Sequence, residues 1–331
     1  MIHNSPKSLS IHITYNNLYF SECVAGLTEG LRSLGHPVTF SESAPRTKID
    51  VQLVIGVNLF PRLSKRNCRL LAGIQTEQLP FWSTASNTGR IKRNLNRFKS
   101  VKGQYEIIYE WNPSLFAAGV GGDRFLPYGC PRRVFTKTKK EYDIAFIGNV
   151  HCSTRRQLLL KEISDNFSLF PDFSPGFGCK KEEVVRASRV LLNIHHYESC
   201  GMEAPRMFDY LSLGACVLSE WSPNTYPFQP QIDFEDFKNR QELFSKLTLL
   251  LKNDYLRDSI AHSGQKKSQT FTYNHVSGIL SLDLLHCIQQ RRNIFLKKVR
   301  SLDSLFRSSC FDSIDLLSKI KRRLFRERTE Q

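Results

Sequence analysis

The chain has 331 residues, which suits two domains better than one, because single hydrophobic cores rarely serve more than about 250 residues. Hydrophobic residues make up 40% of it and charged residues 24%, a globular composition, and no apolar run is long enough to span a membrane. The net charge of +16 favours an anionic partner. The nine cysteines show no CxxC spacing and give no sign of a disulfide framework or a zinc site.

The first half of the chain is predicted to contain several short strands and one helix. An amphipathic segment closed by Gly35 predicts a helix at Phe20–Leu34. Segments rich in β-branched and apolar residues predict strands at Ser8–Tyr15, Pro37–Phe40, Val51–Gly56, Arg69–Ile74 and Tyr105–Tyr109. A turn-rich break at 127–131, followed by a basic stretch to 140, indicates a first domain of residues 1–130. The start lacks the apolar core of a signal peptide, so we expect a cytoplasmic protein.

A second α/β unit opens with Asp143–Gly148, a nearly continuous apolar strand of the kind found in buried parallel sheets. Further strands are predicted at Arg189–His195 and Ala215–Ser219. Helices are predicted at Thr154–Asp165, Lys180–Ser188, Glu203–Leu213, Gln241–Lys252 and Tyr255–Lys267. This repetition predicts an α/β fold with two doubly wound, Rossmann-like domains, the second spanning residues 141–290.

Three loops follow the strands of this second domain. They are Gly148–Cys152, His195–Gly201 and Ser219–Trp221. Ligands of such sheets bind beyond the carboxyl ends of the strands, and binding sites are favoured between domains. We therefore expect all three loops to converge on one cleft between the two domains.

Residues 193–220 place a buried strand, a polar loop and a helix in succession. The N-terminus of the helix presents unpaired N–H groups and the positive end of its dipole, which suit a phosphate. Arg206 can bind a diphosphate through two parallel N–H···O hydrogen bonds. Asp209 lies three residues later on the same helix face, where it can accept hydrogen bonds from ribose hydroxyls. Arg155 and Arg156, at the start of an earlier helix, either add positive charge near the diphosphate or are solvated.

At this point the chain resembles a known family. Arg206-Met207-Phe208-Asp209, followed by Gly214, resembles the R-x-F-E-x-x-x-x-G element of GT-B glycosyltransferases related to the CgeB group, within the wider family-1/family-4 type. Asp143–Gly148 resembles the opening strand of that family's C-terminal domain. Residues 105–129 resemble the end of its N-terminal domain, and residues 271–275 its closing segment. The resemblance covers about residues 8–290.

The resemblance implies a GT-B fold, in which two Rossmann-like domains face across a cleft and the second holds a nucleotide-sugar donor, generally without a metal. By position, Arg206 would neutralise the donor phosphates, and Asp209, in place of the usual Glu, would hold the ribose. The chain departs from the family-4 E-x7-E pattern, because Gly201 stands eight residues before Asp209. Glu198 and Glu203 flank that position, and which of them faces the sugar stays open.

The loops after two of the predicted strands supply further donor-side candidates. His195 and His196 point to opposite faces of their strand, because side chains alternate, and we favour His196 for the cleft. Tyr197 either stacks on a base or packs in the loop. Gly148 and Asn149 are expected to form the loop that approaches the donor closely.

A catalytic base is expected in the first domain, where the acceptor hydroxyl would lie. It must reach the proton that it removes, so carboxylates at strand ends are candidates. Glu77 follows a buried strand and is our first choice, and Glu110 is the second. If the enzyme retains the anomeric configuration, no protein base is needed.

Residues 291–331 carry twelve Lys/Arg against five Asp/Glu. Apolar residues recur at roughly helical spacing among them, at Phe295, Val299, Leu302, Phe306 and Phe311. This pattern predicts a basic amphipathic helical tail. Such a helix either docks on an anionic membrane surface, at the inner face of the membrane, or packs back on the protein.

We therefore predict a metal-independent glycosyltransferase that needs no cofactor. It would move a sugar from a nucleotide-diphosphate sugar to a glycan, lipid-linked or small-molecule acceptor. One alternative is a nucleotide-sugar epimerase or hydrolase on the same fold, and another is a non-enzymatic basic protein that binds membrane or nucleic acid. Nucleic acid is not expected as a partner, because no aromatic residues alternate with Lys/Arg on a predicted sheet face.

Overall fold

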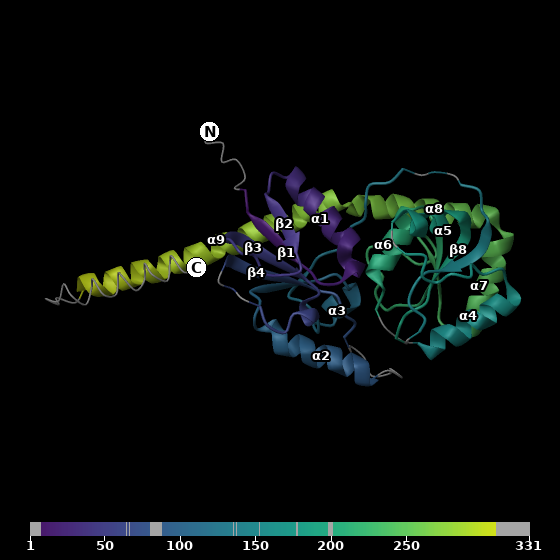
Figure 1. Cartoon of the computed structure of the whole chain (residues 1–331), viewed down its shortest axis with the longest axis horizontal. Coiled ribbons are helices and arrows are strands. Elements are labelled where there is room, and N and C mark those ends of the chain that lie inside the picture. Colours follow the sequence, from purple (N-terminus) through teal and green to yellow (C-terminus); the bar gives the residue numbers. More distant parts are fainter. Residues whose placement is uncertain are drawn as a thin grey trace.

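The computed structural model describes residues 8–308, apart from residues 64, 66, 80–87, 135, 137, 152, 177 and 198–200, with the backbone alone for 88 and 292–308. Two α/β lobes lie side by side, and a long helix, α9 (Tyr273–Ser308), starts at their junction and runs along and past the first lobe (Figure 1). Within the described ranges, no helix is both long enough and apolar enough to cross a membrane.

The first lobe contains a parallel sheet with strand order β2-β1-β3-β4-β5-β6. Its strands are β1 (Ile11–Thr14), β2 (Val38–Ser41), β3 (Ile49–Ile55), β4 (Cys68–Gln75), β5 (Ile107–Glu110) and β6 (Arg124–Phe125). Around them lie α1 (Ser21–Ser33), α2 (Thr88–Lys102), α3 (Pro113–Ala117) and the short 3-10 turns Leu18–Phe20 and Val57–Leu59. The central strands β3 and β4 are buried along most of their length, as expected for a sheet covered on both faces.

The second lobe contains a smaller parallel sheet with strand order β10-β9-β8-β7. Its strands are β7 (Tyr142–Phe146), β8 (Ser188–Asn193), β9 (Cys216–Glu220) and β10 (Glu235–Phe237). Its helices are α4 (Thr154–Asn166), α5 (Cys179–Ala187), α6 (Ala204–Ser212), α7 (Arg240–Lys252) and α8 (Asp254–Ser268), followed by the 3-10 turn Gln269–Phe271. Every strand and helix predicted for residues 8–267 is confirmed within a few residues, whereas α2, α3, β6 and β10 were not predicted.

The chain passes between the lobes twice, and the two crossings are joined by backbone hydrogen bonds. Cys130 N donates to Phe271 O over 3.1 Å, and Tyr273 N donates to Cys130 O over 2.9 Å. From Tyr273 on, α9 packs on α1 of the first lobe. The expected second domain, residues 141–290, therefore includes the part of α9 that lies on the first lobe.

Close packing of α9 on α1 depends on two glycines of α1. A Cβ added at Gly26 would lie 2.1 Å from the Tyr273 ring, and one added at Gly30 would lie 2.4 Å from Ser277 Oγ. No larger residue fits at either position without displacing α9, because packed interiors have few voids. The helical backbone expected for the tail continues to Ser308, and the remainder of the tail lies outside the described residues.

We expect Gly30→Ala to lower the free energy of unfolding by about 1–3 kcal/mol, because the new methyl group overlaps Ser277 and the backbone of Tyr273. The matched control is Gly278→Ala in α9, where an added Cβ meets nothing within 4 Å. That change should be neutral or stabilise the protein by up to about 1 kcal/mol, since Ala is the better helix former. Chemical denaturation measures both, and equal effects would contradict the packing argument.

Candidate functional site

A cavity of about 650 Å³ lies between the two lobes, at the carboxyl ends of β7 and β8. We call it the central cavity. The second lobe contributes the loop after β7, the loop after β8 and the start of α6. The first lobe contributes the segment before α1, the segment after β4 and the start of α2. Most of the residues predicted from the sequence line this cavity, namely Glu77, Gly148, Asn149, His196, Tyr197, Glu203, Arg206 and Asp209.

One predicted residue, Glu110, is not among the described residues that line the central cavity. Glu110 is fully buried at the end of β5. Its carboxylate accepts hydrogen bonds from the backbone N–H of Asn112 over 2.9 Å and of Gly122 over 3.4 Å. Burial raises the pKa of Glu110 to about 8. Glu198 lies outside the described residues.

Arg206 anchors the second-lobe side of the cavity. Its guanidinium donates to Asn193 Oδ1 over 2.8 Å and forms an ion pair with Glu203, three residues before it. The Arg206 side chain is only 9% exposed and lines the cavity. The guanidinium also lies over the Phe146 ring, 5.4 Å from its centroid. These contacts hold a buried positive charge at the cavity wall.

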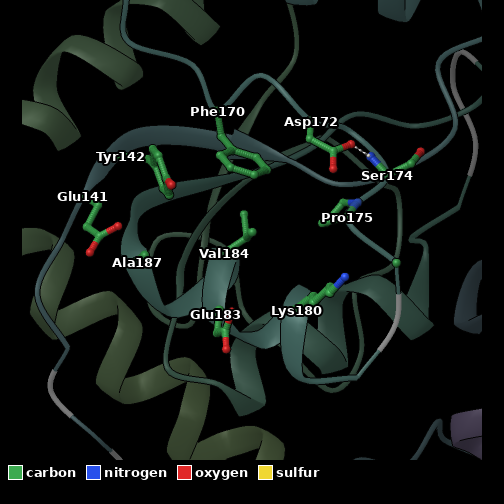
Figure 2. Close-up of a pocket in the computed structure, with 11 residues that line it drawn as sticks. Glu141, Tyr142, Phe170, Asp172, Ser174, Pro175, Lys180, Glu183, Val184 and Ala187 are labelled. Carbon is green, nitrogen blue, oxygen red and sulfur yellow. Dashed lines mark hydrogen bonds between the residues drawn. The ribbon is translucent and has the colours of Figure 1, made fainter.

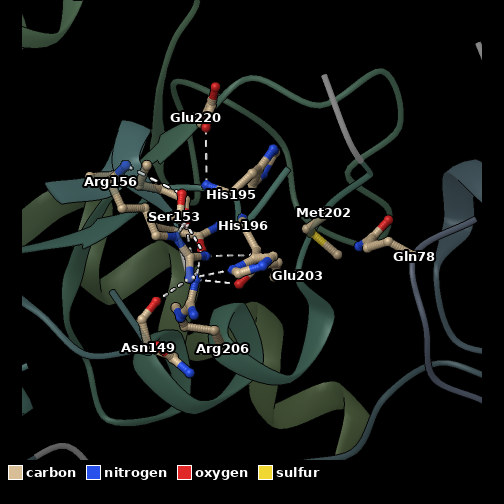
Figure 3. Close-up of polar contacts among 12 residues, drawn as sticks. Gln78, Asn149, Ser153, Arg156, His195, His196, Met202, Glu203, Arg206 and Glu220 are labelled. Carbon is tan, nitrogen blue, oxygen red and sulfur yellow. Dashed lines mark hydrogen bonds and ion pairs between the residues drawn. The ribbon is translucent and has the colours of Figure 1, made fainter. Parts of the chain in front are cut away.

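Glu203 lies between two guanidiniums (Figure 3). Arg156 Nη2 donates to its Oε1 over 2.9 Å, and the backbone N–H of His196 donates to the same oxygen over 2.9 Å. Burial alone would raise the pKa of Glu203, but the charges of Arg206 and Arg156 outweigh it and lower the pKa to about 2. The carboxylate is therefore ionised and fixed in place at neutral pH.

Arg156 is the most deeply buried of these charges, with 2% of its side chain exposed. It donates to the carbonyls of Ile194 (3.0 Å) and Asn149 (2.9 Å), and so ties together the loops that follow β8 and β7. Arg155 points elsewhere and pairs with Glu220. Arg156 therefore lines the central cavity and adds positive charge there, whereas Arg155 does not line it.

The loop at Ser219–Trp221 does not reach the central cavity, so the expectation that all three loops share one cleft is wrong for this loop. Glu220 Oε2 accepts from the backbone N–H of His195 over 3.0 Å, and Glu220 also pairs with Arg155. Glu220 and Trp221 line a separate hollow of about 920 Å³ beside α4 and α7. The physical reason is the strand order, which places β9 one strand farther from β7 than β8.

Gly148 allows the loop after β7 to approach Arg206 closely. A Cβ at this position would lie 2.7 Å from Arg206 Nη2 and 3.2 Å from the Phe146 ring. Any larger residue would push the guanidinium away from its partners. Glycine at this position is therefore favoured by the crowding of the Arg206 and Phe146 side chains and by the backbone φ of 159°.

Asp209 lines the same cavity and is held by Lys181 of α5. Lys181 Nζ is 2.8 Å from Asp209 Oδ2 and 2.5 Å from Glu22 Oε2 of α1. Burial acts to lower the pKa of Lys181, but the two carboxylates outweigh it and raise the pKa. Because Glu22 belongs to the first lobe, this group of three charges crosses the cleft. Glu22 Oε1 also accepts from Gly178 N over 2.9 Å.

The two histidines face opposite ways. His195 is fully buried, and its Nε2 lies 3.3 Å from Ser222 Oγ. His196 is half-buried and lines the cavity, with its Nδ1 3.4 Å from Arg156 Nη1. Burial lowers the pKa of both rings. Tyr197 is buried and clusters with Ile91 of α2 across the cleft, while its ring edge meets His196.

Glu77 follows β4 and lines the central cavity from the first lobe. Asn94 Nδ2 donates to its Oε2 over 3.2 Å, and Gln75 Nε2 donates to its backbone carbonyl over 2.6 Å. Burial raises the pKa of Glu77, against the opposing effect of Arg90 and Arg97. The carboxylate is thus held at the lobe opposite Arg206 and Asp209.

Another hollow, of about 550 Å³, lies at the edge of the second sheet (Figure 2). It is lined by Tyr142 and Phe170 on one side and by Lys180, Glu183 and Val184 of α5 on the other. Among the described residues, it holds none of the predicted site residues and shares Ser174 and Gly176 with the central cavity.

Sequence reasoning missed several residues of the central cavity. Lys181 and Glu22 meet only because α5 and α1 come together across the lobes, and no local pattern marks them. Gln78 and Asn112 of the first lobe also cross the cleft. Gln78 Nε2 donates to Gly201 O over 3.2 Å, and a Cβ at Gly201 would lie 2.5 Å from the Asn112 amide. Only the position of these residues after strands β4 and β5 could have signalled them.

The fold is that of the GT-B glycosyltransferases. HepE from Anabaena, in complex with UDP and glucose, matches with a TM-score of 0.61 at 9% identity, over 83% of this chain and 99% of HepE. AviGT4, a glycosyltransferase involved in avilamycin A biosynthesis, matches with a TM-score of 0.58 at 9% identity, over 85% and 98%. Sucrose-phosphate synthase from Thermosynechococcus elongatus matches with 0.56 at 11%, over 90% and 98%. The predicted fold class is confirmed.

The chain covers only about half of another similar structure, TarM, which matches with a TM-score of 0.54 at 10% identity, over 71% of this chain and 54% of TarM. A comparison with curated protein sequences returned no match.

Residues 180–279 match a protein family described as "Glycosyl transferase-like". This stretch runs from α5 into α9 and contains Arg206 and Asp209, so the family resemblance stated from the sequence is confirmed there.

We expect Glu203→Gln to lower the free energy of unfolding by roughly 3 kcal/mol near neutral pH, because two buried guanidiniums lose their shared carboxylate. The folded-state pKa of Glu203 is depressed to about 2, so its contribution is fully present above the unfolded value near 4.5 and is lost as the pH falls towards 2. The difference from wild type should therefore narrow in acid. The control, Glu183→Gln on the exposed side of α5, should change stability little at any pH. A pH-independent difference for Glu203→Gln would contradict the ion-pair account.

Proposed function

We propose that the chain is a nucleotide-sugar-dependent glycosyltransferase whose donor binds in the central cavity. The observation that carries this proposal is the pair of buried cations, Arg206 and Lys181, at a cavity between the lobes of a GT-B fold. Its volume of about 650 Å³ falls within the range of small-molecule sites, roughly 300–1,000 Å³. The crystal structure of HepE with UDP-glucose supports the choice of donor class.

In this proposal the donor diphosphate lies against Arg206 and the N-terminus of α6, where the positive end of the helix dipole favours an anion. Arg156 keeps Glu203 in place, so that Glu203 in turn orients Arg206. Asp209 accepts hydrogen bonds from the ribose hydroxyls. Gly148 and Asn149 leave room for the phosphates, and His196, Tyr197 and Glu198 complete the donor side.

The transfer breaks the bond between the anomeric carbon of the sugar and the diphosphate, and negative charge develops on the leaving phosphate. Arg206 and Lys181 would stabilise that charge without a bound metal, because fixed positive groups in a partly dry site act strongly on developing charge. Glu77 is the base in an inverting reaction. It stands on the first lobe, faces the cavity and carries a raised pKa, as a base near neutral pH requires.

The acceptor is a glycan, a lipid-linked compound or a small molecule. The twelve basic residues of 291–331 support a peripheral contact with an anionic membrane surface at its inner face. The cytoplasmic side is where nucleotide sugars would meet such an enzyme, and this location belongs to the same proposal.

We expect one of UDP, GDP, dTDP or ADP sugars to bind with micromolar affinity in calorimetry. Arg206→Gln and Asp209→Asn should each weaken that binding by about 1.5–3 kcal/mol, because each loses a charge-assisted contact. The control, Arg189→Gln, removes a cation that pairs with Asp143 outside the cavity and should leave the affinity unchanged. Absence of binding by every nucleotide sugar to the folded protein would sink the proposal, and sugar release without an acceptor would indicate a hydrolase.

We expect Glu77→Gln to reduce kcat by about a hundredfold or more while the donor affinity stays within about twofold, if Glu77 removes the acceptor proton. Because its pKa is raised, the wild-type rate should climb with pH above the range of an ordinary carboxyl, and the variant should lose this limb. The measurement is the pH profile of kcat with the donor identified above. An unchanged profile would exclude Glu77 as the base and favour a retaining reaction.

A further inference from the structure

Helix α2 carries an unusual charge pattern. Its sequence, TGRIKRNLNRFKSVK, contains six Lys/Arg and no Asp/Glu. Asn94, Phe98 and Val101 are buried and form the face that packs on the first lobe, while Ile91 is buried against Tyr197 across the cleft. On the flank of this face stand three exposed arginines, Arg90, Arg93 and Arg97. Residues three and four apart are neighbours on a helix, so these guanidiniums form one row.

This arginine row lines a hollow of its own. The hollow has a volume of about 440 Å³ and is lined by Asn58, Leu59, Glu77, Asn94 and the three arginines. We call it the arginine pocket. Glu77 and Arg90 line both the arginine pocket and the central cavity, so the two spaces meet at these residues. Asn94 Nδ2 holds the Glu77 carboxylate at the junction.

The positive charge of the arginine pocket is not neutralised by ion pairs. Within the described ranges, no carboxylate oxygen is recorded within 4.0 Å of the guanidinium of Arg90, Arg93 or Arg97, whereas Lys102 on the same helix pairs with Asp123 over 3.1 Å. Glu77 is the one carboxylate among the lining residues. Three cations against one anion leave an excess that a dianion would balance. Clustered guanidiniums bind phosphate oxygens in pairs, which suits a phosphate group better than a single carboxylate.

The arginine pocket also lies on the side of the cleft where the acceptor is expected to bind. It belongs to the first lobe, opposite the proposed donor residues Arg206 and Asp209, and Glu77 separates the two spaces. A group bound here would place its neighbouring hydroxyl at the Glu77 carboxylate. The position therefore matches that of an acceptor and not of the donor diphosphate.

We propose that the arginine pocket binds a phosphate of the acceptor, so that the acceptor substrate is a phosphate ester with a free hydroxyl. This inference rests on the proposed function. In the transfer, the acceptor hydroxyl gives its proton to Glu77 and its oxygen bonds to the anomeric carbon. The bond from that carbon to the diphosphate breaks, and the nucleoside diphosphate leaves with the electron pair. The phosphate ester is either a soluble sugar or polyol phosphate or a lipid phosphate.

The test uses the full chain with a saturating nucleoside diphosphate, which is UDP unless the calorimetry above identifies another base, so that the donor site is filled and a phosphate probe reports on a second site. Two double variants are compared with wild type. Arg93→Gln/Arg97→Gln removes two charges of the arginine pocket, and Lys92→Gln/Lys99→Gln removes two exposed charges of α2 that do not line it. The soluble probe is glycerol 3-phosphate in calorimetry. The lipid probe is vesicles of phosphatidylcholine with phosphatidic acid, measured by co-sedimentation, and all three proteins carry the same basic tail.

We expect the phosphate probe to bind wild type and Arg93→Gln/Arg97→Gln to weaken it about tenfold or more, with a change below about threefold in Lys92→Gln/Lys99→Gln. Binding of glycerol 3-phosphate with this pattern assigns a soluble acceptor, and binding of the vesicles alone with this pattern assigns a lipid phosphate. Equal weakening in both double variants, or no binding of either probe, overturns the proposal.

A UDP titration of each protein separates this inference from the function beneath it. Neither double variant touches the central cavity, so the affinity for UDP should match that of wild type. Loss of phosphate binding with UDP binding intact confirms a distinct subsite. Failure of wild type to bind any nucleotide sugar overturns the donor proposal, which is a different result from failure of the phosphate probes alone.

Discussion

The candidate site depends on one buried carboxylate, Glu203, that lies between two guanidiniums. Taking charges out of water is costly unless each is paired and its remaining donors are satisfied. Here Arg156 meets backbone carbonyls of the loops after β7 and β8, and Arg206 meets Asn193 and the Phe146 ring. Because these contacts join the end of β7, the end of β8 and the loops that follow them, the charge cluster sets the shape of the second-lobe wall. Gly148 is one consequence, since only glycine leaves room for Arg206.

A second set of charges relates the two lobes to each other. Lys181 of α5 bridges Asp209 of α6 and Glu22 of α1, so that a proposed ribose-binding carboxylate is coupled to the first lobe. A donor that competes for Asp209 would alter the same contacts that hold the lobes in register. The backbone also connects the lobes, at the two crossings that are hydrogen-bonded to each other at Cys130 and Tyr273. The first lobe brings Glu77 and the arginine pocket to the open side of the cleft.

Much of the fold could be read from the sequence, since the apolar strands and amphipathic helices repeat in an order that implies parallel sheets. Helix α2 was not predicted, because its six basic residues leave only a weak apolar stripe of four residues. Its proposed role depends on the arginines beside that stripe and not on the stripe itself. The short strands β6 and β10 were not predicted, because a strand of two or three residues is too short to show an alternation of apolar and polar residues. Glu110 shows that a position after a strand does not by itself place a carboxylate at the cavity, since this side chain accepts hydrogen bonds from backbone N–H groups.

The sequence by itself determined two α/β units, the motif at Arg206 and Asp209, and the excess of basic residues. Local spacing suffices for these features, because hydrophobic periodicity and helix-face geometry act over a few residues. Only the tertiary structure decided that Arg156 lines the cavity while Arg155 lies outside it, and that Lys181 joins the site. Ion pairs across the lobes link residues far apart in the chain, and burial decides which charges must pair. Neither quantity is encoded in any single segment.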